Sequence, residues 1–214
     1  MNRPAATALE PRELLLERRI ERIERVVAAR SRSLSIVLEG IHDPHNLAAI
    51  LRTAEGLGLQ DVHVVEAASG FRPNAAVTQG ADKWLTLHRH ADARAATQAL
   101  HDTGHAVYAS LCSGDAVPLH EIPFERKIAL VFGNEHDGVT SAMAEAADAR
   151  FHIPMAGFTQ SFNVSVAAAI ALWAAVDARR RLGLTGDLAP EDRQRLTSDF
   201  CARAVKQAKR LGLR

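Results

Sequence analysis

The sequence is poor in cysteine, in aromatic residues and in long apolar runs. Its 214 residues include two cysteines, Cys112 and Cys201, and only 5% are aromatic. Two distant cysteines make no CxxC pair, so a disulfide scaffold is excluded and a reducing compartment is expected. The longest apolar stretch, residues 164–176, has thirteen residues, whereas a membrane span needs about 20. No apolar leader precedes Glu10, and we expect a cytoplasmic protein.

The sequence also lacks the short motifs of common nucleotide and hydrolase sites. Neither GxxxxGK[ST] nor GxSxG occurs, which excludes a P-loop and leaves a hydrolase elbow without support. Gly56-Leu57-Gly58 resembles part of a dinucleotide fingerprint, but it follows a predicted helix, where a glycine at the helix end explains it better. Ten histidines are present, yet no cysteine or carboxylate completes a ligand set around them, so no metal is expected.

Net charge is nearly absent, because two basic ends compensate an acidic middle. The formal total is +1, with +3 on residues 1–33, +5 on residues 200–214 and −7 on residues 34–199. Basic ends are typical of proteins that contact phosphate groups. A solvated, charge-laced surface is the alternative, and it explains the N-terminal end nearly as well as phosphate binding does.

Short β-branched segments alternate with segments of helical periodicity through most of the chain. Strands are predicted at residues 35–39, 62–66, 84–88, 106–111, 128–132 and 151–153, and helices at 11–30, 47–57, 92–103, 139–147, 165–182 and 191–211. This order predicts an α/β fold, a largely parallel sheet with helices on both faces. Ligands of such sheets bind outside the carboxyl ends of the strands. The site is therefore expected in the loops at 40–46, 112–118, 133–138 and 154–163.

The first segment that folding alone does not explain is residues 38–54, LEGIHDPHNLAAILRTA. A plain interpretation is that Pro44 fixes a turn and Asn46 caps the helix. Arg52 lies well outside the apolar stripe of that helix. It is either a solvated arginine or one that faces an anionic ligand. A guanidinium suits the second role, because it can donate two parallel hydrogen bonds to a phosphate.

Two further segments join a strand to a polar, glycine-containing loop. In residues 129–140, a plain tight turn explains Gly133 and Gly138 but not the carboxylate of Glu135 between them. In residues 153–165, Ser161 and Asn163 stand where a helix starts, and either of them can act as its N-cap. Together they also place hydrogen-bonding side chains and free N–H groups at that helix start.

The three segments together resemble the sequence motifs of the SPOUT class of RNA methyltransferases. The closest branch is that of the tRNA guanosine-2′-O-ribose methyltransferases, matched by PHNLAAILRTA, FGNEHDG and IPMAGFTQSFNVSVAAAI in order. Each motif alone is weak, whereas the combination is specific. Phe162 stands where many relatives carry leucine, and His136 stands where a lysine is often seen.

The resemblance implies a SPOUT fold, in which the C-terminal part of the sheet domain forms a deep trefoil knot. It implies a catalytic domain at residues 34–183, with helical extensions at residues 1–33 and 184–214. It implies S-adenosyl-L-methionine as the cofactor, tRNA as the partner and a homodimer whose two copies meet at each site. No metal and no membrane are implied. The substrate of this branch is the guanosine of the D-loop.

Site residues are carried over from the motifs by position in this sequence. The resemblance implies that the catalytic residues are Arg52, Asn46, Glu135, Ser161 and Asn163. It implies that the cofactor is held around Ser110, Leu111, Gly133, Ile153, Met155 and Phe162. Together with the basic ends, it implies RNA-binding residues at Arg18, Arg19, Arg22, Arg203, Lys206, Lys209 and Arg210.

A free arginine cannot act as a base at neutral pH, since its pKa exceeds about 12. The hypothesis is therefore that Arg52 binds the phosphate beside the target ribose and orients the 2′-hydroxyl for attack on the methyl group. Several alternatives stay open. They are methylation of another RNA or another tRNA position, a non-catalytic RNA-binding member of the fold, and a small-molecule α/β enzyme that needs no basic ends.

Overall fold

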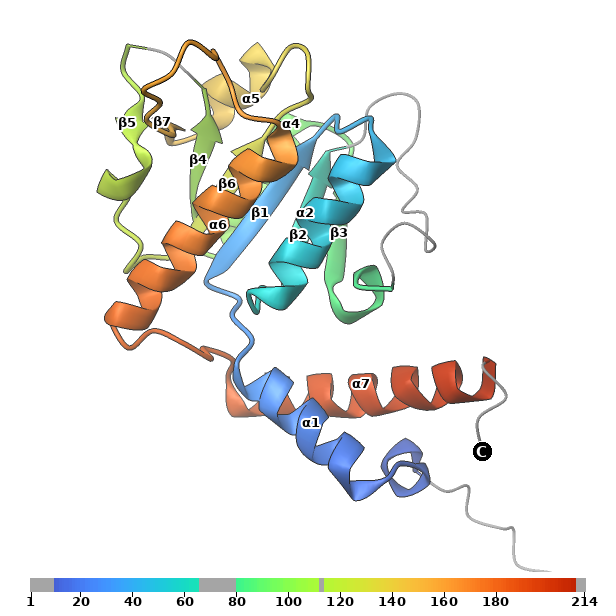
Figure 1. Cartoon of the computed structure of the whole chain (residues 1–214). Helices are drawn as coiled ribbons and strands as arrows, with labels where there is room; N and C mark the ends of the chain where they lie inside the picture. The colour runs from blue at the N-terminus through green and yellow to red at the C-terminus, as the bar shows by residue number, and fades with distance from the viewer. Residues whose placement is uncertain (1–9, 66–79, 112–113, 211–214) are drawn as a thin grey trace, which may run out of the picture. The chain divides into compact units, whose positions relative to one another are not determined.

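The computed structural model describes residues 10–65, 80–111 and 114–210, with side chains as far as Lys206 (Figure 1). The chain divides into two compact units. One consists of residues 31–187 and the other of residues 1–30 together with 188–214. The helices near the two ends of the chain belong to the second of these units.

The larger unit is built on a seven-stranded sheet in the order β3-β2-β1-β6-β4-β7-β5. Its strands are β1 (Leu34–Glu39), β2 (Asp61–Val65), β3 (Thr86–His90), β4 (Ala106–Ser110), β5 (Val117–Pro118), β6 (Ile128–Phe132) and β7 (Ala149–His152). All of the strand pairings found in the described residues are parallel. Both β1 and β6 are buried along their whole length, as expected for strands covered on two faces.

Helices cover both faces of this sheet (Figure 1). On one face, α2 (Pro44–Gly56) and α6 (Val164–Arg181) lie side by side and bury apolar side chains such as Ile50 and Leu172 against Ile36 and Leu130. On the other face, α4 (Ala93–Asp102) and α5 (Ser141–Ala146) pack on strand residues that include Val37 and Val131. Short 3₁₀ turns are η2 (Asp82–Trp84) and η3 (Leu119–Glu121). The α/β prediction is confirmed.

Several predicted boundaries are wrong for identifiable reasons. The strand expected at 84–88 spans Thr86–His90, because Trp84 ends a 3₁₀ turn. The helix expected from residue 47 begins at Pro44, where Asp43 accepts a hydrogen bond from the N–H of His45. The capping interpretation of Asn46 is therefore wrong. Gly58, with φ +87°, follows the end of α2 as expected of a glycine at a helix end.

The smaller unit contains the two chain ends. It comprises η1 (Pro11–Leu14), α1 (Glu17–Ala28) and α7 (Pro190–Arg210), and α7 contacts both of the others. The single helix predicted at 11–30 is in fact a 3₁₀ turn and a helix, separated by an extended Leu15 and Leu16. Ile23 of α1 and Phe200 of α7 are among the buried side chains of the unit. None of the described helices is long and apolar enough to cross a membrane.

Candidate active site

A cavity of about 460 Å³ lies at the carboxyl ends of β4, β6 and β7. This is the edge where a parallel α/β sheet is expected to bind its ligand, and the volume is in the usual range for ligand pockets. Its lining comes from four stretches of chain, residues 110–111, 132–138, 151–155 and 160–167. Segments that are far apart in the sequence therefore form one site.

The cavity contains most of the residues implied by the resemblance. All six residues expected to hold the cofactor line it, namely Ser110, Leu111, Gly133, Ile153, Met155 and Phe162. Three of the five expected catalytic residues, Glu135, Ser161 and Asn163, line it as well. Asn46 reaches the site only through hydrogen bonds, and Arg52 is not part of the lining.

A chain of hydrogen bonds joins the three motif segments behind this lining. Asn163 caps α6, because its Oδ1 accepts from the N–H groups of Ser165 and Val166. Its Nδ2 donates to Oδ1 of Asn46 over 3.1 Å, and Nδ2 of Asn46 donates to Oε1 of Glu135 over 2.8 Å. Each amide donates towards Glu135. This series of hydrogen bonds therefore ends at an acceptor, which an ionised Glu135 provides.

The protonation of Glu135 follows from this arrangement. Burial raises the pKa of Glu135, but hydrogen bonds from Asn46 and from the backbone N–H groups of Glu135, His42 and Asp43 outweigh it. The net pKa of Glu135 is lower than that of an ordinary glutamate. At neutral pH the cavity therefore carries a fixed carboxylate at the meeting point of the motifs.

Two glycines close the loop that carries Glu135. The N–H and C=O groups of Asn134 and Gly138 bond each other over 3.1 Å, and Gly138 has φ +71°. A Cβ on Gly133 would lie only 2.0 Å from the carbonyl carbon and oxygen of Gly138. The tight-turn interpretation of these glycines is thus correct, and the turn also presents Glu135 to the cavity.

Glu39, which anchors the far end of the same loop, was not predicted from the sequence. Glu39 ends β1, is buried, and accepts hydrogen bonds from the N–H and the Oγ1 of Thr140, at 2.9 and 2.7 Å. Thr140 in turn caps α5. A carboxylate at the end of an otherwise apolar strand was the available signal, since such a group needs buried donors.

The electrostatics of the cavity favour a cationic ligand. Among its described lining residues are two carboxylates, Glu135 and Asp137, and neither lysine nor arginine. Apolar side chains such as Leu111, Met155 and Phe162 provide the rest of a surface suited to a flat, partly apolar ligand. A phosphate group would need a cation that these lining residues do not provide.

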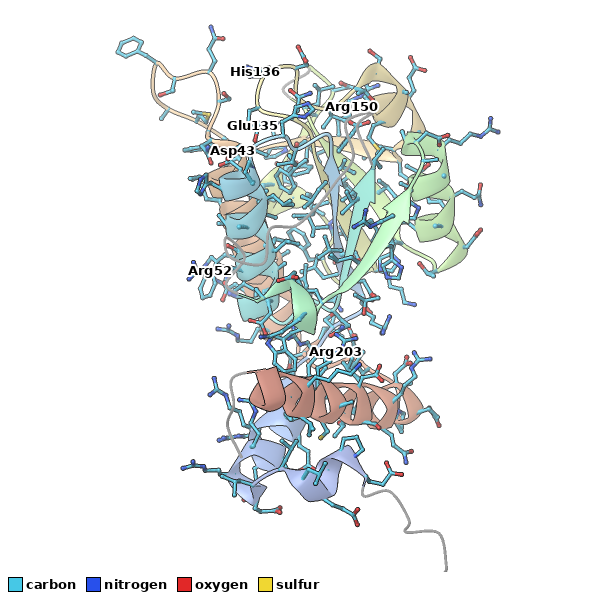
Figure 2. The ribbon with its side chains drawn as sticks, turned by 90° about the vertical axis from the view of Figure 1, so that its right-hand side faces the viewer. Asp43, Arg52, Glu135, His136, Arg150 and Arg203 are labelled. Carbon is cyan, nitrogen blue, oxygen red and sulfur yellow. The ribbon has the colours of Figure 1, made fainter. Side chains whose placement is uncertain are left out.

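Arg52 lies towards the other end of α2 from Asp43 and Glu135 (Figure 2). It is exposed, and it follows Asn46 by six residues, which is about 9 Å along a helix. With His45, Ala49 and Gly56 it forms an exposed stripe of α2. Within one chain, the structure therefore does not bring Arg52 to the cavity.

The expected RNA-binding residues belong to the smaller unit. Arg18, Arg19 and Arg22 lie on α1, and Arg203 and Lys206 lie on α7. Arg18, Arg22 and Lys206 are exposed, whereas Arg19 and Arg203 are half-buried. The side chains of Lys209 and Arg210 are outside the described residues.

The described residues hold no group of three or more histidine, cysteine, aspartate or glutamate side chains that could bind a metal ion. Cys201 is a free, buried thiol, and burial raises its pKa. Cys112 lies outside the described residues.

Comparison with known proteins identifies the family. The model of the SpoU rRNA methylase family matches residues 33–173, about two thirds of the chain. This chain belongs to the SpoU rRNA methylase family. The family resemblance seen in the three motifs is thereby confirmed, and so is the expectation of a methyltransferase.

The relatives of this SpoU family member include enzymes of nearly the same length. The tRNA (guanosine(18)-2′-O)-methyltransferase of Thermus thermophilus is 38% identical over 86% of this chain and 96% of its own. The crystal structure of the TrmH/SpoU tRNA modifying enzyme of Aquifex aeolicus has a TM-score of 0.81 at 29% identity, over 88% of this chain and 98% of that one.

A structure of an AdoMet-bound rRNA methyltransferase from Sinorhizobium meliloti is also similar, with 27% identity and a TM-score of 0.60. The match covers 74% of this chain but only 60% of that one. The present chain therefore spans almost the whole of the tRNA-modifying relatives and just over half of this rRNA enzyme.

Proposed function

We propose that this protein transfers the methyl group of S-adenosyl-L-methionine to the ribose 2′-hydroxyl of guanosine 18 in the D-loop of tRNA. The observation that carries the proposal is the cavity, which is formed by the three motif segments and lined by all six expected cofactor residues. The tRNA enzymes among the relatives, matched over nearly their full length, support tRNA over rRNA as the substrate.

The residues of the cavity fit the expected cofactor. S-adenosyl-L-methionine carries a positive sulfonium and an ammonium group, and the described lining residues offer the carboxylates of Glu135 and Asp137 and no lysine or arginine. Leu111, Ile153 and Met155 offer apolar contact for a flat base. When bound, the cofactor supplies an electrophilic methyl group. The AdoMet-bound relative supports the same assignment.

Glu135 and Arg52 then have different roles in the reaction, one towards the cofactor and one towards the RNA. Glu135, fixed by Asn46, favours the positive charge of the cofactor and stays ionised. Arg52 is free of the cavity and suits an RNA phosphate, which it can bind through two parallel hydrogen bonds. Holding that phosphate orients the adjoining 2′-hydroxyl for in-line attack, and such orientation supplies a large part of enzymatic rate enhancement.

The homodimer is part of this proposal, because one chain leaves Arg52 outside the cavity. Beside the α2 stripe, α6 exposes Val166 and Trp173, which are 46% and 53% accessible. An exposed apolar stripe next to small residues such as Ala49 suits packing against a second copy. A second copy seated on this face can deliver its Arg52 to the cavity of the first.

The trefoil knot and the cytoplasmic location also belong to the proposal. Along the chain, β7 follows β6 but lies beyond β4 in the sheet, and α6 then returns to pack beside α2. The connection from β7 to α6 thus passes back over the edge of the sheet where the cavity loops lie. This path supports the proposal that the C-terminal part of the chain is threaded through a loop. Pulling on both ends of the chain tests the knot, since a knotted chain stays shorter than its full contour length.

Substitution of Arg52 tests whether this residue acts in methyl transfer without contributing to cofactor binding. Arg52→Ala is expected to bind S-adenosyl-L-methionine as tightly as the parent chain, because the side chain is not in the cavity. Methyl transfer to unmodified tRNA is expected to fall at least 100-fold at saturating substrate, about 3 kcal/mol of transition-state stabilisation. Calorimetry and a labelled-methyl assay measure the two quantities. Near-normal transfer by Arg52→Ala, or no transfer to tRNA by the parent chain, would overturn the proposal.

A further inference from the structure

One aromatic side chain beside the cavity is fully exposed among the described residues. Phe158 lies in the loop between β7 and α6 and is 109% accessible, so none of the described residues covers its ring. Phe162, in the same loop, is 38% accessible and lines the cavity. Covering an exposed phenyl ring removes apolar surface from water, so a ligand that stacks on Phe158 gains binding free energy there.

The position of Phe158 is fixed by the two ends of its loop. Met155 before it and Gln160 after it both line the cavity. Because a chain spans at most about 3.6 Å per residue, the Cα of Phe158 lies within about 7 Å of that of Gln160 and about 11 Å of that of Met155. The ring therefore stands beside the cavity, outside its lining.

The chemistry of the loop suits a nucleobase better than a phosphate. Residues 153–163 include no charged side chain, so they offer no cation to the RNA backbone. An aromatic face, in contrast, stacks on any unpaired base, and proteins that read unpaired RNA use such faces. Thr159 and Gln160, both exposed, add hydroxyl and amide groups next to the ring.

The location of the reacting hydroxyl decides which base this is. A ribose whose 2′-hydroxyl enters the cavity keeps its own base within one bond of the sugar, at the surface around the cavity. We propose that Phe158 stacks on the base of the nucleotide whose ribose is methylated, and so helps to select an unpaired nucleotide. This inference rests on the proposed function, because it assumes that the substrate is RNA.

Three substitutions of Phe158 in the full chain test the proposal. Phe158→Ala is expected to lower kcat/KM for unmodified tRNA about tenfold or more, the usual effect of losing one base–aromatic stack. Phe158→Leu is expected to be nearly as poor, because it keeps apolar area but has no ring face. Phe158→Trp is expected to retain activity. Binding of S-adenosyl-L-methionine is expected to be unchanged in all three.

A fluorescence measurement makes the test independent of catalysis. Phe158→Trp adds one indole to the two tryptophans of the chain, and stacking on a base is expected to quench it when tRNA is added. The parent chain under the same titration is the control. If the parent transfers no methyl group, the proposed function fails, while the quenching still reports whether the ring stacks.

Two results would overturn the proposal. Wild-type kcat/KM in Phe158→Leu, or no additional quenching in Phe158→Trp, would show that the ring face is not used. Separation of the two copies of the chain by Phe158→Ala, seen by light scattering, would instead assign Phe158 to a contact between copies.

Discussion

The carboxylate of Glu135 accepts the last of two successive hydrogen bonds, which both pass through Asn46. Substitution of Asn46 therefore tests directly what this arrangement contributes to methyl transfer. Asn46 gives one hydrogen bond to Glu135 and accepts one from Asn163. Hydrogen bonds to charged groups contribute about 1.5–3 kcal/mol each. Asn46→Ala is therefore expected to slow methyl transfer about 10- to 100-fold.

The same substitution is expected to raise the pKa of Glu135 towards its ordinary value, because the side-chain hydrogen bond that lowers it is gone. The depressed pKa makes Glu135 stabilising above its unfolded value of 4.5, and that contribution is lost as the pH falls through the folded pKa. Side-chain carboxyl NMR titration measures the shift. Gln98→Ala is the matched control, since Gln98 donates to Asp102 on α4. An unchanged Glu135 titration in Asn46→Ala would contradict the assignment.

A group of histidines on β2 and β3 predicts a second contribution to the pH dependence of stability. His63 is buried, its Nδ1 lies 2.9 Å from Nε2 of His90, and its ring stacks on His88. Burial, with further contributions from His88 and His90, lowers the pKa of His63 from 6.5 to about 3. With both rings neutral, one of these two nitrogens donates to the other in an N–H···N hydrogen bond.

Since unfolded His63 binds a proton below pH 6.5 and folded His63 does not, stability falls as the pH is lowered from 6.5 towards 3. The loss between pH 6.5 and 5 is expected to be about 1.6 kcal/mol. Urea unfolding at several pH values measures it, and His63→Gln is expected to flatten the dependence. His120→Gln, at an exposed histidine, is expected to leave it intact. Equal slopes in His63→Gln and the parent would contradict the inferred neutral state of His63.

At the scale of elements, the terminal helices are expected to carry the salt dependence of RNA binding. Replacing Arg203, Lys206, Lys209 and Arg210 with glutamine leaves the buried residues of α7 in place, such as Phe200 and Ala204. Each RNA phosphate that the variant no longer neutralises is expected to reduce the slope of log affinity against log salt by about 0.7–0.9. Titrations between low and moderate salt measure the slope.

Arg195 provides the control on the same helix, because it is paired with Asp192. Arg195→Gln is expected to leave the slope unchanged. If the fourfold variant also keeps the parent slope, the basic end of α7 is a solvated surface.

The elements that sequence predicts well are those whose burial leaves a continuous apolar pattern. The strand Ile128–Phe132 is predicted to the residue, because all five of its side chains are buried. The edge strand β3 reads Thr-Leu-His-Arg-His, without such a pattern, and its prediction is shifted by two residues. The two-residue β5 is too short to leave any periodicity.

The site could be predicted only as far as motifs and sheet topology allow. The loops after β6 and β7 are placed together by the parallel sheet, so Gly133, Glu135 and Ser161 line one cavity as expected. The position of Arg52 depends instead on what packs against α2. A single sequence does not encode that contact locally. Glu39 was missed because its partner, Thr140, is distant in sequence.

For the whole molecule, mixing two inactive variants tests the proposal that copies share their sites. Arg52→Ala keeps an intact cavity, and Glu135→Ala keeps an intact Arg52. If Arg52 acts on the cavity of the other copy, mixed dimers contain one complete site, and the mixture is expected to regain activity that neither variant has. A mixture as inactive as its components, although light scattering shows mixed dimers, would place Arg52 at the cavity of its own copy.

The central claim is that the cavity directs methyl transfer to one ribose hydroxyl of tRNA. The direct measurement uses methyl-labelled S-adenosyl-L-methionine with two matched tRNAs, one unmodified and one with 2′-deoxyguanosine at position 18. Labelled 2′-O-methylguanosine is expected at position 18 of the first tRNA, and no label is expected in the second. Equal labelling of both, or label in a base, would contradict it.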